Sequence, residues 1–160
     1  MRLLGTTLLA CVALVATGAG TGAGKCVDGT CSCKDVDAGG YLDTGTLTDI
    51  APSAFRGCAS LTSLNAPKMT VIGPNAFRAC TSLASVELPH ATSVGERAFG
   101  GCTSLTSIEL SVATSIGERA FDGCTSLTSI DMPHVTAASI GDKAFDGCTS
   151  LPTGRLELEL

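Results

Sequence analysis

The chain has 160 residues, of which 44% are hydrophobic but only 4% aromatic, and it contains no Trp. This length supports one domain, and so few large rings exclude a conventional core built around aromatic side chains. The formal net charge is −5 at pH 7, and no cluster of Lys and Arg occurs. The composition therefore argues against binding to nucleic acid or to an anionic membrane surface.

The amino-terminal segment, residues 1–24, differs from the rest of the chain. Arg2 is followed by an apolar stretch and then by Gly, Thr and Ala up to Gly24. This pattern predicts a cleaved secretory signal peptide, and hence a secreted or cell-surface protein. Two alternatives stay open: an uncleaved membrane anchor, since about 20 apolar residues span a bilayer, and a lipoprotein box formed by LeuLeuAlaCys ending at Cys11.

The next segment, residues 25–46, contains three closely spaced cysteines and precedes a repeat array. The end of such an array exposes its core and needs a cap. A disulfide from Cys26 to Cys31 or Cys33 would hold a cap in place and leave the third cysteine of the segment unpaired. A disordered lead-in is the alternative, and a zinc site is disfavoured because no His lies nearby to supply a fourth ligand.

Residues 47–151 repeat one sequence pattern. The run AFRGCASLTSL, which starts at Ala54, returns as AFRACTSLASV at Ala76, AFGGCTSLTSI at Ala98 and AFDGCTSLTSI at Ala120. A period in the twenties with apolar residues at every second or third position is typical of a leucine-rich-repeat solenoid. Each coil of a solenoid contacts only its neighbours, so a narrow column of small apolar side chains is a sufficient core.

Alternating apolar residues predict one extended strand in each coil. In the coil that begins at Cys124, Ile130 and Met132 share one face and Asp131 takes the other. Stacked strands would pair in parallel about 4.8 Å apart, with their apolar faces forming one wall of the core. A second extended piece ends at a Gly that recurs once per coil, and one helical or 3-10 turn then returns the chain.

The runs TSLTSIEL and SIGERAFDGC are similar to the BspA-like type of leucine-rich repeat, and the resemblance extends from Leu47 to Leu151. It implies a solenoid with one parallel strand per coil and short extended and helical or 3-10 turns on the other side. Members of this family are mostly extracellular or surface-displayed, and some are adhesins that bind host matrix proteins. The resemblance implies a general binding role and names no ligand.

Two columns, meaning one position taken through successive coils, are predicted to fill the core. Phe rings would stack, and Cys would act as small apolar, reduced thiols, because the Cβ vectors of neighbouring coils run parallel rather than toward each other. Disulfides between coils are the alternative in a secreted chain, whereas a straight row of ligands cannot surround a metal. The columns are Phe55, Phe77, Phe99, Phe121 and Phe145, and Cys58, Cys80, Cys102, Cys124 and Cys148.

The solvent side of the strand wall carries the candidate ligand-binding residues. Carboxylates repeated at the spacing of neighbouring strands repel one another, and they would attract a divalent cation or a basic partner. Between a cation site and a face that is simply solvated, the solvated face is favoured. As a binding surface, this wall predicts a protein partner, such as extracellular matrix or another surface protein. The candidates are Glu87, Glu109 and Asp131 with Thr106 and Thr128.

No HExxH, P-loop or GxSxG motif occurs, so we expect neither an enzyme nor a cofactor. Two alternatives to partner binding stay open. The chain could be a structural fragment of a longer surface protein whose ligand site lies elsewhere, or regular Thr and Ser could bind ice or a crystal surface. Residues 152–160 are interpreted as a degenerate C-terminal end, because Pro152 distorts the start of a strand.

Overall fold

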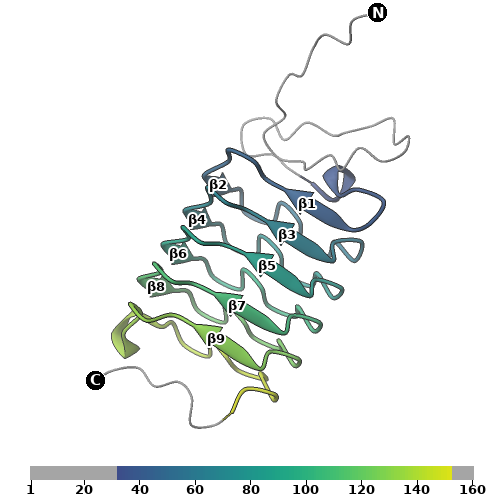
Figure 1. The fold of residues 1–160 in the computed structure, drawn as a ribbon. Coiled ribbons are helices and arrows are strands. Elements are labelled where there is room, and N and C mark those ends of the chain that lie inside the picture. The colour runs from purple at the N-terminus through teal and green to yellow at the C-terminus, as the bar shows by residue number, and fades with distance from the viewer. Residues whose placement is uncertain (1–31, 153–160) are drawn as a thin grey trace, which may run out of the picture.

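The computed structural model describes residues 32–152, which form an elongated solenoid of stacked coils (Figure 1). The expected signal peptide, Cys26 and Cys31, and all but Pro152 of the expected C-terminal end lie outside the described residues. The long axis of the solenoid runs perpendicular to the strands, so each coil contributes one strand to the wall seen in Figure 1.

Two parallel sheets run along the solenoid. The larger, sheet A, has the order β1-β3-β5-β7-β9, and the smaller, sheet B, has the order β2-β4-β6-β8. Leu42, Leu64, Val86 and Ile108 are the buried centres of the first four strands of sheet A. The predicted parallel strand in each coil is therefore confirmed. The strands of sheet A are β1 (Tyr41–Asp43), β3 (Ser63–Asn65), β5 (Ser85–Glu87), β7 (Ser107–Glu109) and β9 (Ser129–Asp131), and those of sheet B are β2 (Asp49–Ile50), β4 (Val71–Ile72), β6 (Ser93–Val94) and β8 (Ser115–Ile116).

The first coil begins earlier than the sequence suggested. β1 pairs in parallel with β3, aligning Leu42 with Leu64, although β1 falls within the segment 25–46 that was expected to be a cap or lead-in. Leu42 is fully buried. This coil lacks the recurring TSL letters, so only its inward apolar residue marks it as part of the array. A short 3-10 helix, η1 (Cys33–Asp35), precedes it and closes its own first turn through a Ser32–Asp35 capping box.

The third side of each coil is a series of tight turns bonded to the next coil. The amide of Phe77 donates to the carbonyl oxygen of Ala98 at 2.8 Å, and the amide of Ala79 donates to that of Gly100 at 2.7 Å. A two-residue insertion in the last coil forms a second 3-10 helix, η2 (Ala137–Ser139). All three sides of the solenoid therefore carry backbone hydrogen bonds between coils, which satisfies the polar groups of a chain with very short strands.

The recurring glycine is required by the close approach of two coils. A Cβ built on Gly95 would lie 2.7 Å from the carbonyl oxygen of Ile72 and 2.8 Å from the nitrogen of Pro74. Gly73, Gly117 and Gly141 would meet the preceding coil in the same way. Because the obstructing atoms are backbone, no side-chain rearrangement can make room for a methyl group.

The Phe residues form a continuous stack inside the solenoid. Neighbouring ring centroids lie 5.3 to 5.4 Å apart with interplanar angles of 4° to 10°. Phe55, Phe77, Phe99 and Phe121 are fully buried, whereas Phe145, in the last coil, is partly buried. Each ring thus covers the face of the next, and stacking at this separation contributes about 0.5 to 1.5 kcal/mol per pair beyond the buried area.

The cysteine column requires one correction. Cys33 is disulfide-bonded to Cys58, with their Cα atoms 5.4 Å apart, so Cys58 is not a free thiol and Cys33 does not pair with Cys26. Cys33 lies in η1, outside the repeat, so the parallel Cβ directions that separate cysteines of successive coils do not apply to it. The other four are free, and Cys80 Sγ donates to the Phe55 carbonyl oxygen at 2.9 Å.

Candidate binding face

The outer face of sheet A consists of two polar columns on either side of the buried central residues. Each strand exposes its first and third residue, while the second points into the core. The strand wall brings Glu87, Glu109 and Asp131 into one column, with Glu87 aligned to Glu109 and Glu109 to Asp131. We call this surface the A face; its residues are Tyr41, Ser63, Ser85, Ser107 and Ser129 in one column and Asp43, Asn65, Glu87, Glu109 and Asp131 in the other.

The A face carries charge of one sign. Its outward residues include four carboxylates, and the five strands contain no Lys or Arg. Parallel strands lie about 4.8 Å apart, which sets the spacing of aligned carboxylates such as Glu87 and Glu109. The column therefore produces a negative potential along the wall, attractive to a positively charged group.

Thr106 and Thr128, predicted as ligand-binding residues, lie just before the strands and also connect the coils. The Thr128 hydroxyl donates to the Thr106 carbonyl oxygen at 3.0 Å, and the Thr106 hydroxyl donates to that of Ala84 at 3.4 Å. Both hydroxyl hydrogens are thus used within the chain, which joins one coil to the next. Only the oxygen lone pairs of these two residues remain for a ligand.

A second Thr column repeats this arrangement beside sheet B. Thr70, Thr92 and Thr114 donate to the carbonyl oxygens of Thr48, Thr70 and Thr92 at 3.1, 3.0 and 3.3 Å. The regular Thr of the repeat therefore has a structural explanation. The Ser column of the A face was missed by sequence reasoning, although Ser107 lies two residues before Glu109 and the period of two places both on one face.

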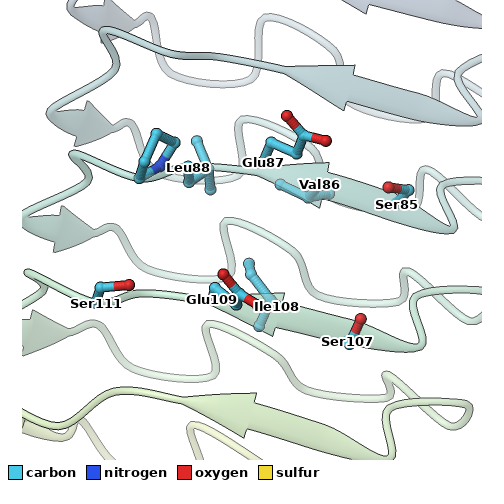
Figure 2. A pocket seen from close by; sticks show the side chains of 9 residues that line it. Ser85, Val86, Glu87, Leu88, Ser107, Ile108, Glu109 and Ser111 are labelled. Atoms are coloured by element: carbon cyan, nitrogen blue, oxygen red, sulfur yellow. The ribbon is translucent and has the colours of Figure 1, made fainter.

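A hollow of about 360 Å³ opens on the A face between β5 and β7. Figure 2 shows Ser85 and Glu87 on one strand and Ser107 and Glu109 on the next, at the rim of this hollow. Pro89 and Ser111 line its end, where Ser111 occupies the position that is Pro in the neighbouring coils. The hollow thus combines carboxylates and hydroxyls with apolar surface.

The turn side of the solenoid differs from the A face because it carries charges of both signs, including two ion pairs. Arg97 Nη1 lies 2.6 Å from Glu96 Oε1, and Arg119 Nη1 lies 3.6 Å from Glu118 Oε1. These pairs are exposed, and each contributes at most about 1 kcal/mol. An approaching cation therefore meets charges of both signs there and only carboxylates on the strands of the A face.

Within residues 32–152, no group of three or more His, Cys, Asp or Glu could hold a metal ion. The same part of the chain contains no helix long and apolar enough to cross a membrane. The carboxylates of the A face thus form a row along one wall, without the convergence that a cation requires.

This architecture, with short parallel strands stacked at a period of 22 residues and a continuous internal Phe stack, defines a leucine-rich-repeat solenoid. Residues 48–157 match the BspA type leucine rich repeat region (6 copies), and the chain belongs to this family. The resemblance inferred from the repeated runs is therefore confirmed.

Solved structures provide a second comparison. The chain is similar to the leucine-rich repeat protein of T. pallidum, with 32% identity and a TM-score of 0.67 over 71% of this chain and 56% of that one. It is also similar to a leucine-rich cell surface protein of Faecalibacterium prausnitzii, with 33% identity and a TM-score of 0.63 over 71% of this chain and 31% of that one. The chain thus spans about half of the first structure and a third of the second. A comparison with curated proteins found no match.

Proposed function

We propose that this protein is a non-enzymatic, secreted or cell-surface scaffold that binds a protein partner through the A face. The observation that supports this most directly is the contrast of the two surfaces: the strands of the A face contain carboxylates and no Lys or Arg, while the turn side carries charges of both signs, including two ion pairs. Family membership supports a binding scaffold, and the surface description of the F. prausnitzii relative supports the location.

The described residues span five strands of sheet A, which at about 4.8 Å per strand gives a wall about 20 Å long. This length suits a segment of a protein better than a small molecule. Extracellular matrix proteins and other surface proteins are the partner classes to test. The ice-binding alternative is disfavoured because Thr hydroxyls donate into the backbone and carboxylates share the outer face.

The test is a binding assay in two stages. The full chain is first used to isolate a partner from extracellular matrix and host-cell surface fractions, and the purified partner is then titrated against the wild type and against Glu87→Lys/Glu109→Lys/Asp131→Lys. We expect charge reversal to abolish binding, because three attractive contacts become repulsive. The matched control, Glu96→Lys/Glu118→Lys, alters exposed carboxylates on the turn side and should retain binding. Equal binding by wild type and the triple variant would exclude the A face.

A further inference from the structure

The backbone pairing of sheet A is less complete at one place, between β5 and β7. Other neighbouring strand pairs of this sheet align three residue pairs each, whereas β5 and β7 align only Glu87 with Glu109. The amide of Thr106 lies 3.5 Å from the Ala84 carbonyl oxygen, while the equivalent bond from Thr128 to Thr106 is 2.9 Å. The central residue Val86 is 7% exposed, against 2% for Leu64 and Ile108.

Two departures from the repeat lie in the coils that contain β5 and β7. Ala84, just before β5, occupies a position that is Thr in the coils before and after it, and the hydroxyl bond that it lacks would join β5 to β3 rather than to β7. Ser111 stands where the neighbouring coils have Pro89 and Pro133 and lines the hollow at its end. The hollow thus lies between the third and fourth coils, where the sequence departs from the pattern of the repeat.

From this geometry we infer that the hollow between β5 and β7 receives an arginine side chain of the protein partner. This inference rests on the proposed function and adds to it the residue type at the centre of the contact. Glu87 and Glu109 rim the hollow on adjacent strands (Figure 2), and no cation on sheet A competes for them.

Arginine fits the chemistry of this hollow better than lysine does. A guanidinium presents five N–H donors in a planar fork, which can divide between two carboxylates and the hydroxyls of Ser85 and Ser107, whereas an ammonium presents three donors from one point. The apolar stem of the side chain would lie against Pro89 at the end of the hollow. Binding in the hollow would also remove water from around the guanidinium and the carboxylates. The attraction between these charges is therefore stronger there than on the open face of the sheet.

The inference is tested without knowledge of the partner, using N-acetyl-arginine amide as the probe. The full chain, labelled with nitrogen-15, is titrated to millimolar probe at low ionic strength and followed by amide chemical shifts. We expect saturable shifts confined to residues 84–89 and 106–111. N-acetyl-lysine amide should bind several-fold more weakly, and N-acetyl-citrulline amide, which has nearly the same shape without the charge, should produce no saturable shift.

Glu87→Gln and Glu109→Gln should each lower the affinity for the arginine probe by about tenfold, which is the loss expected when a charge-assisted hydrogen bond is removed. Glu118→Gln serves as the matched control and should leave the affinity unchanged. Shifts spread over the whole surface, equal binding of the lysine probe, or unchanged affinity in Glu87→Gln/Glu109→Gln would overturn the inference. If the probe fails while charge reversal still abolishes partner binding, the arginine assignment is wrong and the A face remains the binding surface.

Discussion

At the scale of single residues, Ala79 is a departure from the repeat that carries backbone strain. Its φ is 60°, and the same position in the other coils is Gly57, Gly101, Gly123 and Gly147 with φ from 71° to 75°. A left-handed backbone conformation destabilises the folded state of a residue with a Cβ by about 1 to 2 kcal/mol. Substitution by Gly removes this strain, but part of the gain is offset because Gly has more conformational entropy in the unfolded chain.

We therefore expect Ala79→Gly to raise the free energy of unfolding by about 0.5 to 1 kcal/mol. Ala79 is exposed, so no buried apolar contact is lost. Urea unfolding followed by circular dichroism measures the effect. Gly101→Ala is the reverse substitution one coil later and should lower stability by a similar amount. An unchanged or lower stability of Ala79→Gly would contradict the strain argument.

Thr44 is a second residue that differs from its column. Its hydroxyl is buried and, within residues 32–152, has no hydrogen-bond partner, while Ala66, Leu88 and Leu110 occupy the equivalent place in later coils. An unsatisfied buried hydroxyl costs about 1 to 3 kcal/mol. Thr44→Val keeps the shape and should raise the free energy of unfolding by about 1 kcal/mol.

The same substitution elsewhere supplies the control for Thr44→Val. Thr92 donates its hydroxyl to the Thr70 carbonyl oxygen at 3.0 Å, so Thr92→Val removes a bond between coils and should lower stability by about 0.5 to 1 kcal/mol. If Thr→Val raises the free energy of unfolding at Thr44 and lowers it at Thr92, the first hydroxyl is unsatisfied and the second forms a stabilising hydrogen bond. A loss of stability in Thr44→Val would show that its hydroxyl has a partner in solution.

At the scale of elements, positions that recur could be predicted from the sequence and positions that occur once could not. The strand around Ile108 was predicted because its spacing is repeated in neighbouring coils. β1 was missed because it shares only Leu42 and the period of two with the later strands, and the Cys33–Cys58 bond was missed because Cys33 stands outside the repeat. The hollow between β5 and β7 was missed because it depends on how two neighbouring strands pair, which the repeated letters do not specify, although Ser111 at its end departs from the repeat.

The Cys33–Cys58 disulfide joins η1 to the second coil and should stabilise the amino-terminal end of the solenoid. The two residues are 25 apart in sequence, and closing a loop of this length contributes about 3 to 4 kcal/mol in the chain-entropy account. We expect reduction by dithiothreitol to lower the free energy of unfolding by about that amount, measured in urea with and without reductant.

Cys33→Ser separates the disulfide from other effects of the reductant. This variant should have the stability of the reduced wild type and show no further change on reduction. Peptide mapping of the alkylated, unreduced protein should recover Cys33 and Cys58 joined and Cys80, Cys102, Cys124 and Cys148 as thiols. A wild type whose stability is insensitive to reductant would contradict the role of the bond.

At the scale of the whole molecule, the internal cysteine column links stability to pH. Burial raises the pKa of Cys80 from 9.0 to about 11 and also raises the pKa of Cys102. The native solenoid therefore keeps these thiols protonated in a pH range where the unfolded chain ionises them.

The sign of the effect follows from proton binding. Below about pH 9 both states hold the thiol protons, and the stability from burial is fully present. As pH rises from 9 toward 11, the unfolded chain releases protons that the native chain retains, so the free energy of unfolding falls, by up to about 1.4 kcal/mol per pH unit for each such thiol. Urea unfolding at pH 8, 9.5 and 10.5 measures this slope, and Cys80→Ala, which removes this one thiol, should give a shallower slope. Identical slopes in the wild type and the variant would mean that Cys80 ionises at the same pH in the native and unfolded states. The conclusion that Cys80 is a buried thiol would then be wrong.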